Sequence, residues 1–225
     1  MSTIRQYTTQ CALCGKESKH HVVSSYSLFG FPDLDFRPQT MYRETMRYWM
    51  PECPNCGYAN IPLNRLFDLP KETILKIIDD IKSGFHWDET YAIRFARMGA
   101  MLAESNDYQG AATQFLRVAW AFDDDRDEQS AAHWRKVAME HVTLEMTKIS
   151  EEMVCIYADM LRRTGDFHAV LSIDESQLHD NLHIRLIEYQ KELSEQEDRA
   201  AHTLDENSEL CKLAKDYQGG MFFCL

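Results

Sequence analysis

Two copies of the pattern Cys-x-x-Cys-Gly give this chain four thiols that could act together. The thiols belong to Cys11, Cys14, Cys53 and Cys56, and 38 residues separate the second from the third. Four thiolates surround a tetrahedral Zn²⁺ at about 2.3 Å, and a two-residue spacer lets one tight turn supply two sulfurs. A glycine after each pair allows the positive φ that such a turn needs. The sequence therefore predicts one structural metal site with these four cysteines as ligands.

The same four thiolates hold iron as well as zinc. A rubredoxin-like iron redox protein is therefore an alternative, and a single Cys-x-x-Cys pair also occurs in thiol redox chemistry. His20 and His21, near the first pair, are candidates for hydrogen bonds to a thiolate. The other three cysteines, Cys155, Cys211 and Cys224, are expected to be free thiols in a reducing compartment.

Other groups that could do chemistry form incomplete patterns. Two histidine pairs, His179 with His183 and His133 with His141, share faces of predicted helices. No glutamate stands between His179 and His183 in the zinc-protease order, so we expect solvated side chains. The acidic run 123–128 lacks the central glycine of a calcium loop and is expected to be a capped helix junction. We therefore predict no catalytic residue and a protein that is not an enzyme.

Composition limits the classes of protein to consider. The 225 residues are 44% hydrophobic and 27% charged, which is typical of a globular protein. The polar N-terminal residues lack the apolar core of a secretory signal. No stretch approaches the roughly 18 apolar residues that a membrane helix needs. We expect a soluble, cytoplasmic protein that does not contact a membrane.

Charge is unevenly distributed along the chain. Residues 1–65 carry seven basic and five acidic side chains, whereas the remainder carries 17 and 31, and the net charge is −12. An acidic body repels phosphate backbones, which disfavours nucleic-acid binding. Weak binding through Lys16, Arg43 and Arg47 in the N-terminal part stays open as a further alternative.

The N-terminal part is predicted to be a small β-structured zinc ribbon, residues 1–66. Residues 22–26 and 34–37 read as strands, and each cysteine pair is expected to close a hairpin. The 38-residue spacer exceeds the roughly 15 to 20 residues of a compact zinc module, so the excess is expected to form a loop. Its aromatic residues Phe29, Phe31 and Phe36 form a docking surface or pack against the helices, and packing is the favoured interpretation.

Residues 67–225 are predicted to form a helical domain. Apolar residues recur at helical spacing over 70–84, over 89–104 after a cap at Asp88, and over a partner helix that begins after a turn at 106–108. Further helices are expected over 127–150, from residue 151 onward, and over 181–204. The apolar C-terminal residues 219–223 are expected to pack back onto the protein. The fold class is therefore mainly α, with a small N-terminal zinc ribbon followed by antiparallel helices.

Two of these helices carry the pattern of a tetratricopeptide repeat, with small residues where the helices approach and large residues between them. The positions are Phe95, Met98, Gly99, Leu102, Tyr108, Ala111, Phe115 and Val118. A partial second copy over 157–170 follows 59 residues later instead of the usual 34. Such helical repeats present a face for a peptide or protein partner.

The chain resembles, over about residues 8–175, a bacterial family called domain of unknown function 2225. The resemblance lies in the two cysteine motifs and in residues 52–59, 115–120, 127–128 and 157–166. It implies a zinc-ribbon-like module followed by tetratricopeptide-like helices and no known reaction. The acidic tail 176–225 departs from the family, which leaves the role of the tail open.

Overall fold

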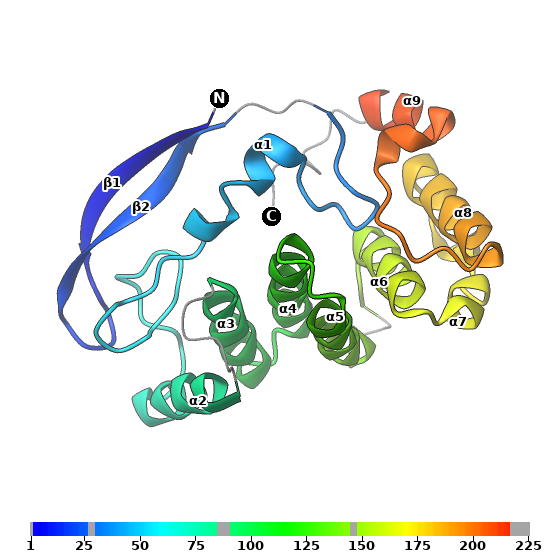
Figure 1. Ribbon diagram of the computed structural model, residues 1–225. Helices are drawn as coiled ribbons and strands as arrows, with labels where there is room; N and C mark the ends of the chain where they lie inside the picture. Colours follow the sequence, from blue (N-terminus) through cyan, green and yellow to red (C-terminus); the bar gives the residue numbers. More distant parts are fainter. Residues whose placement is uncertain (1, 27–29, 85–90, 145–147, 217–225) are drawn as a thin grey trace. The chain divides into compact units, whose positions relative to one another are not determined.

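The computed structural model describes residues 2–26, 30–84, 91–144 and 148–216. Within these ranges the chain is mainly helical with one small antiparallel sheet near the N-terminus, which confirms the predicted fold class (Figure 1). By internal contacts the chain divides into a first unit of residues 1–27 and 44–144 and a second unit of residues 28–43 and 145–225. The predicted division into a zinc-ribbon-like module, residues 1–66, and a helical domain, residues 67–225, stays a prediction.

The sheet of the first unit is a single hairpin of two strands. Strand β1 (Thr3–Gln10) pairs antiparallel with β2 (Glu17–Ser25), and Tyr7 lies opposite His20. Strand β2 contains most of the strand predicted over 22–26 but begins five residues earlier, and β1 was not predicted. The strand predicted over 34–37 is wrong, because the chain turns there. Phe36 has φ of 59° and donates its backbone N–H to the carbonyl of Asp33.

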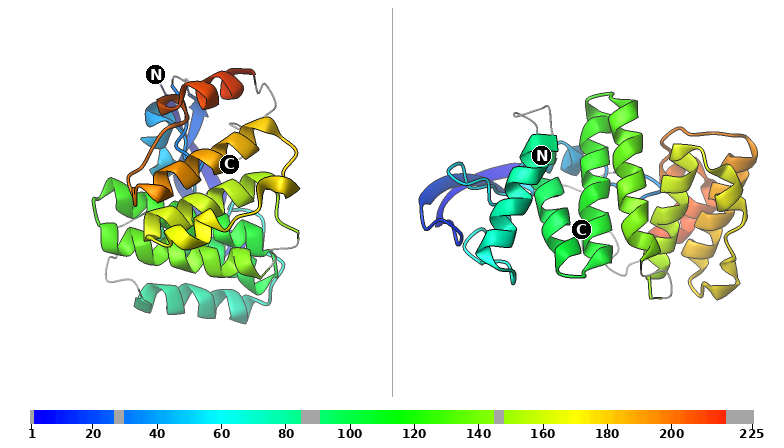
Figure 2. Two further views of the ribbon diagram at one scale, coloured as in Figure 1. Left: turned by 90° about the vertical axis from the view of Figure 1, so that its right-hand side faces the viewer. Right: turned by 90° about the horizontal axis from the view of Figure 1, so that it is seen from below.

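The described part of the first unit also contains a short 3₁₀ turn at Met46–Tyr48 and four α-helices. They are α2 (Lys71–Gly84), α3 (Ala92–Glu104), α4 (Tyr108–Asp124) and α5 (Glu128–Thr143). Helices α3, α4 and α5 lie side by side in an antiparallel row (Figure 2). The helix predicted to run to residue 150 ends at Thr143. Asp88, the predicted cap of α3, lies outside the described residues.

Carboxylates cap the turns between these helices. Asp107 accepts a hydrogen bond from the backbone N–H of Gly110 at 2.9 Å, and Asp127 accepts one from Ser130 at 3.0 Å. Each satisfies an N–H group that has no partner inside the helix. Within the acidic run, Asp123 also pairs with the buried Arg135. The run is therefore a capped helix junction, as predicted.

Helices α3 and α4 approach closely at one small residue. A Cβ built on Gly99 of α3 would lie 2.9 Å from Cε1 and 3.0 Å from Cδ1 of the Phe115 ring in α4. Phe115 is buried, and the Trp134 ring of α5 stacks on it with a centroid separation of 5.7 Å. The close approach at Gly99 agrees with the sequence pattern. The assignment of a tetratricopeptide-like repeat stays a prediction.

The second unit contains the short helix α1 (Thr40–Arg43) and four later helices. These are α6 (Glu151–Thr164), α7 (Phe167–Leu171), α8 (Asn181–Glu195) and α9 (Ser208–Asp216), with 3₁₀ turns at Glu175–Gln177 and Leu204–Glu206. A fully buried Arg162 joins α6 to α8 and to the segment after it. It donates to Gln190 at 2.6 Å, to Asp159 at 2.7 Å and to the backbone carbonyl of Asp198 at 2.7 Å.

The helix predicted over 181–204 ends early, at Glu195. Glu197 has φ of 54°, and the Asp198 N–H donates back to the carbonyl of Leu193 at 3.0 Å, which closes the helix end. The Asp198 carbonyl then accepts from Arg162. Tertiary contacts therefore override the helical pattern of this segment.

The spacer between the cysteine pairs contributes a buried segment to the second unit. Leu34 is fully buried and donates its N–H to the carbonyl of His202, and Leu204 donates its N–H to that of Pro32. Phe36 is buried, and Lys215 of α9 lies 5.7 Å from the centroid of the Phe31 ring. These contacts confirm the packing interpretation for Phe36, whereas Phe31 is partly exposed beside Lys215. Residues 30–39 contain no helix or extended strand, as expected of a loop, although most of them are buried. Phe29 and the apolar residues 219–223 lie outside the described residues.

We predict that Gly99→Ala destabilises the first unit by about 1–3 kcal/mol, because the new methyl group overlaps the Phe115 ring. Phe115→Leu removes the ring atoms that this methyl group would overlap. The double variant should therefore lose less unfolding free energy than the sum of the two single variants, as measured by urea denaturation. Single effects that add within about 0.5 kcal/mol would contradict the proposed overlap.

Candidate metal centre

The two cysteine pairs lie on turns with the same backbone hydrogen bonds, which we call the first knuckle (residues 11–16) and the second knuckle (residues 53–58). In the first, Cys11 N–H donates to the Lys16 carbonyl and Gly15 N–H to the Cys11 carbonyl, both at 2.9 Å. The second repeats these two bonds at 2.8 and 2.9 Å. Gly15 and Gly57 have φ of 75° and 74°, the left-handed conformation that glycine adopts without strain.

Each knuckle closes an antiparallel pair of chain segments, as predicted. The first joins β1 to β2, whose last paired residues are Gln10 and Glu17. The second lies inside an isolated bridge between Glu52 and Ala59. Because the pairing holds both ends of each turn, the two cysteines of a knuckle are fixed relative to each other.

The four sulfur atoms form one compact cluster. Cys11 Sγ lies 3.7 Å from Cys56 Sγ, Cys14 Sγ lies 3.6 Å from Cys53 Sγ, and all four lie within 4.8 Å of one another. A tetrahedron with metal–sulfur bonds of about 2.3 Å separates its sulfurs by about 3.8 Å. The cluster could therefore hold one metal ion, and each knuckle supplies two of the four sulfurs.

Backbone N–H groups of the knuckles are directed at the sulfurs and favour their thiolate forms. Burial raises the pKa of the Cys53 thiol, but the N–H groups of Asn55 and Cys56 and the side-chain hydrogen bonds of Cys14 and Cys56 together outweigh this effect and lower the pKa to about 7. For Cys11, burial dominates over the N–H groups of Cys14 and Leu13, so its pKa is raised. Burial also raises the pKa of Cys56. A bound cation would favour all four thiolates over the thiols.

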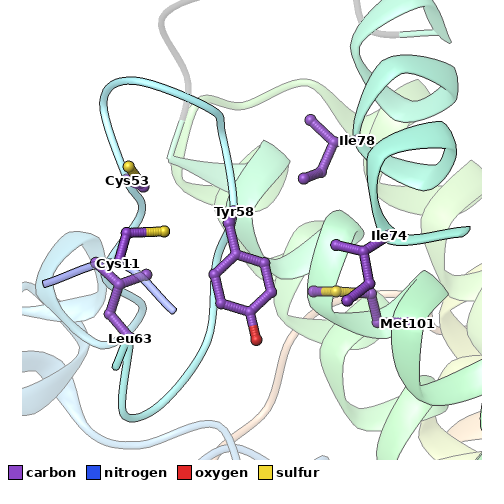
Figure 3. Close-up of a cluster of buried hydrophobic side chains, with 7 residues drawn as sticks. All are labelled: Cys11, Cys53, Tyr58, Leu63, Ile74, Ile78 and Met101. Carbon is purple, nitrogen blue, oxygen red and sulfur yellow. The ribbon is translucent and has the colours of Figure 1, made fainter. Parts of the chain in front are cut away.

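The cluster is part of the hydrophobic core of the first unit (Figure 3). Cys11 and Cys53 are buried together with residues from the loop after the second knuckle and from α2 and α3: Tyr58, Leu63, Ile74, Ile78 and Met101. A bond from Ala12 N–H to the Leu63 carbonyl at 3.1 Å also ties the first knuckle to that loop. The small hairpin is therefore packed against helices at its turn, which carries two of the four sulfurs.

An ion-pair cluster fixes the second knuckle to α3. Arg97 donates to the Glu52 carboxylate and, at 3.1 Å, to the carbonyl of Gly57. Arg94, one turn earlier, donates from Nε to the same carboxylate at 3.2 Å. The Arg97 side chain is only 5% exposed, so Glu52 provides the opposite charge that a buried guanidinium requires.

The loop after the second knuckle depends on a buried hydroxyl group. Tyr58 Oη donates to the Arg65 carbonyl and accepts from Asn60 Nδ2 and from the Phe67 N–H, each at 2.9 Å. Neither these contacts nor the pairing of Glu52 with Arg97 was predicted. In the sequence, Glu52 and Tyr58 lie within the stretch 52–59 that contains the second cysteine pair, and this position was the only indication that they support the site.

The two histidines near the first knuckle have partners other than a thiolate. His20 Nε2 lies 2.8 Å from the Ser18 hydroxyl, and the His20 ring packs 5.7 Å from that of Tyr7. The His21 ring lies 6.0 Å from the Tyr48 ring. A sulfur contact comes instead from Asn55, whose Nδ2 lies 3.9 Å from Cys53 Sγ.

The remaining histidine pairs do not form metal sites in the described part of the chain. His183 is buried with Nδ1 3.1 Å from Glu151, and Nδ1 of His141 donates to the Val137 carbonyl at 2.8 Å. His179 and His133 are exposed. The expectation of solvated side chains is thus wrong for His183, since Glu151 of α6 satisfies its Nδ1.

The free thiols and the cations considered for nucleic-acid binding lie outside the sulfur cluster. Cys155 is buried, as predicted, and burial raises its pKa. Cys211 is a partly exposed free cysteine. Arg43 belongs to the second unit and pairs with Asp33 at 2.6 Å, whereas Arg47 and Lys16 belong to the first. Cys224 lies outside the described residues.

Comparison with known families supports the resemblance found in the sequence. Residues 4–166 match the model of a family described as an uncharacterised protein conserved in bacteria, DUF2225. The chain therefore belongs to this family, and the match includes all four clustered cysteines. No curated protein and no solved structure matches the chain. No described helix has the length and apolar character needed to cross a membrane.

We predict that Gly57→Ala destabilises the protein more than Gly15→Ala does. Both substitutions impose a left-handed conformation on alanine, at a cost of about 1–2 kcal/mol. At Gly57 a Cβ would also lie 2.9 Å from Arg97 Nη1 and 3.1 Å from Ile78 Cγ2, whereas nothing lies within 4 Å at Gly15. Urea unfolding of the two metal-loaded variants measures the difference, which should be about 1–3 kcal/mol. Equal losses would show that the second knuckle is not closely packed on α2 and α3.

We predict that Cys53→Ser unfolds the hairpin and the knuckles, because a site with three sulfurs loses much of the roughly 10–16 kcal/mol that structural zinc contributes. Calorimetry and metal analysis of the purified variant measure the effect. Cys211→Ser, which lies outside the cluster, is the control and should keep its metal and its melting temperature. A Cys53→Ser protein that melts normally and retains its metal would contradict the site.

Proposed function

We propose that the protein is a non-enzymatic scaffold in which one structural Zn²⁺ fastens the N-terminal ribbon to the helical body, and in which acidic helices of that body bind a peptide or protein partner. The ligands are Cys11, Cys14, Cys53 and Cys56. The observation that carries the proposal is the convergence of these sulfurs, at tetrahedral separations, inside the core shared with α2 and α3. Reduced thiolates of this kind suit a cytoplasmic protein.

The donor set supports a structural role for the metal. Catalytic zinc usually has three protein ligands and one position for water or substrate, whereas four protein ligands leave no such position. Two of the four cysteines, Cys11 and Cys53, are also buried from solvent. We therefore propose no catalytic residue for this protein.

Metal analysis separates zinc from iron, the alternative for the same ligands. We predict that protein purified from cells grown with both metals is colourless and contains one equivalent of zinc per chain. Inductively coupled plasma mass spectrometry and the visible absorption spectrum measure this. A red preparation that bleaches on reduction and contains one iron would instead favour the rubredoxin-like alternative and remove the structural-zinc role.

The proposed partner is basic. Residues 145–225 carry 17 acidic and eight basic side chains, and the exposed Glu188, Glu192 and Glu195 lie along α8. Affinity capture with the full chain should recover a protein that is lost when Glu188 and Glu195 are changed to lysine. The same change at the exposed Glu72 and Asp80 of α2 is the control. No stoichiometric partner, or one that both variants retain, would count against the acidic face.

A further inference from the structure

A second site lies beside the ion-pair cluster of the first unit, in a hollow that the metal centre does not use. The hollow has a volume of about 290 Å³. Its walls come from β2, from the segment that begins with the 3₁₀ turn at Met46–Tyr48, and from α3. The charged or titratable side chains of its wall belong to Lys19, His20, His21, Arg47, Glu52 and Arg94, and we call it the basic hollow.

The basic hollow is positively charged although the chain as a whole carries −12. Its single carboxylate, Glu52, is already bound by Arg97 from the core side and by Arg94. Within the described residues, neither Lys19 nor Arg47 forms an ion pair, and both side chains are exposed. Three cations against one carboxylate leave a net charge of +2 on the wall.

The environment of His20 is consistent with this charge. Burial lowers the pKa of its imidazole, and the positive charges of Arg94 and of His21 lower it further. His20 is held on the wall by its contacts with Ser18 and Tyr7. Charged groups on β2 and α3 thus act on the same small space.

The wall that carries these cations is fixed in place. Arg94 donates from Nη1 to the carbonyls of Arg47 at 3.0 Å and of Met50 at 3.4 Å, while its Nε binds Glu52. These bonds join α3 to the segment that carries Arg47. The guanidinium of Arg94 and the backbone that carries Arg47 are therefore held in place before an ion binds, which lowers the ordering cost of binding.

We propose that the basic hollow binds a phosphate group. A phosphate monoester carries about −1.5 to −2 charges at pH 7 and presents three strong acceptor oxygens, which matches a wall of net charge +2. A carboxylate would compensate only half of that charge. The volume is at the lower end of small-molecule sites, so the hollow has room for a phosphate group and for part of the molecule attached to it. Arg47 offers a planar pair of N–H donors to phosphate oxygens, and Lys19 offers a point charge.

The phosphate could belong to a small phosphorylated molecule or to a nucleic-acid backbone. The two sources differ in the number of contacts and therefore in salt dependence. A small molecule fills one hollow, whereas a backbone needs several cations and its affinity falls steeply with salt. The acidic remainder of the chain favours the small molecule.

The test is isothermal titration calorimetry of metal-loaded, full-length protein with inorganic phosphate and with phosphoserine. Saturable binding of one equivalent is expected, and the double variant Lys19→Gln, Arg47→Gln should weaken it at least tenfold. The matched control is Lys16→Gln, Arg65→Gln, which removes the same charge from exposed positions outside the hollow and should bind as the unchanged protein does. Metal content and melting temperature, measured on both variants, keep loss of folding separate from loss of binding.

Equal weakening by the two double variants would overturn the proposal, because it would show attraction by overall charge and not by the hollow. Absence of saturable binding to the unchanged protein at millimolar phosphate would overturn it too. The last titration uses a single-stranded oligonucleotide of 12 nucleotides in place of phosphoserine. Tighter binding than phosphoserine, with a steep salt dependence that Lys19→Gln, Arg47→Gln reduces, would assign the phosphate to a nucleic-acid backbone. Binding no tighter than phosphoserine would assign it to a small molecule.

Discussion

Convergence of four sulfurs into one small volume is the constraint on which the first unit depends. A two-stranded hairpin buries too little surface to be stable alone. Here its turn lies in the same core as Tyr58, Ile74 and Met101, so the hairpin shares the burial of the helices. A cation between the sulfurs would turn this contact into a closed link between segments that lie some 40 residues apart. The position of β1 and β2 therefore depends on the knuckles more than on their own pairing.

The same region shows how one carboxylate can serve two neighbouring sites. Glu52 precedes the second knuckle and accepts hydrogen bonds from Arg97, whose guanidinium also holds the carbonyl of Gly57. This interaction secures the knuckle against α3. It also neutralises the only carboxylate on the wall of the basic hollow, so that Lys19 and Arg47 dominate the charge there. The geometry of the metal centre and the charge of the hollow are thus linked through one side chain.

The sequence was sufficient where the signal is local. The spacing of Cys11 and Cys14 specifies a turn by itself, and periodic apolar residues separated by turn residues such as those at 106–108 specify helices. It was insufficient where distant segments decide the structure. Leu34 pairs with the backbone of His202, and no local pattern encodes such a bond. The carbonyl of Asp198, just after the end of α8, likewise accepts a hydrogen bond from Arg162 of another helix.

X-ray absorption spectroscopy at the zinc edge tests the central claim most directly, because it reports the type and distance of the atoms bound to the metal. The account predicts four sulfur atoms at about 2.3 Å and no lighter ligand. A first shell that contains nitrogen or oxygen, or fewer than four sulfurs, would contradict a closed site built by the two knuckles.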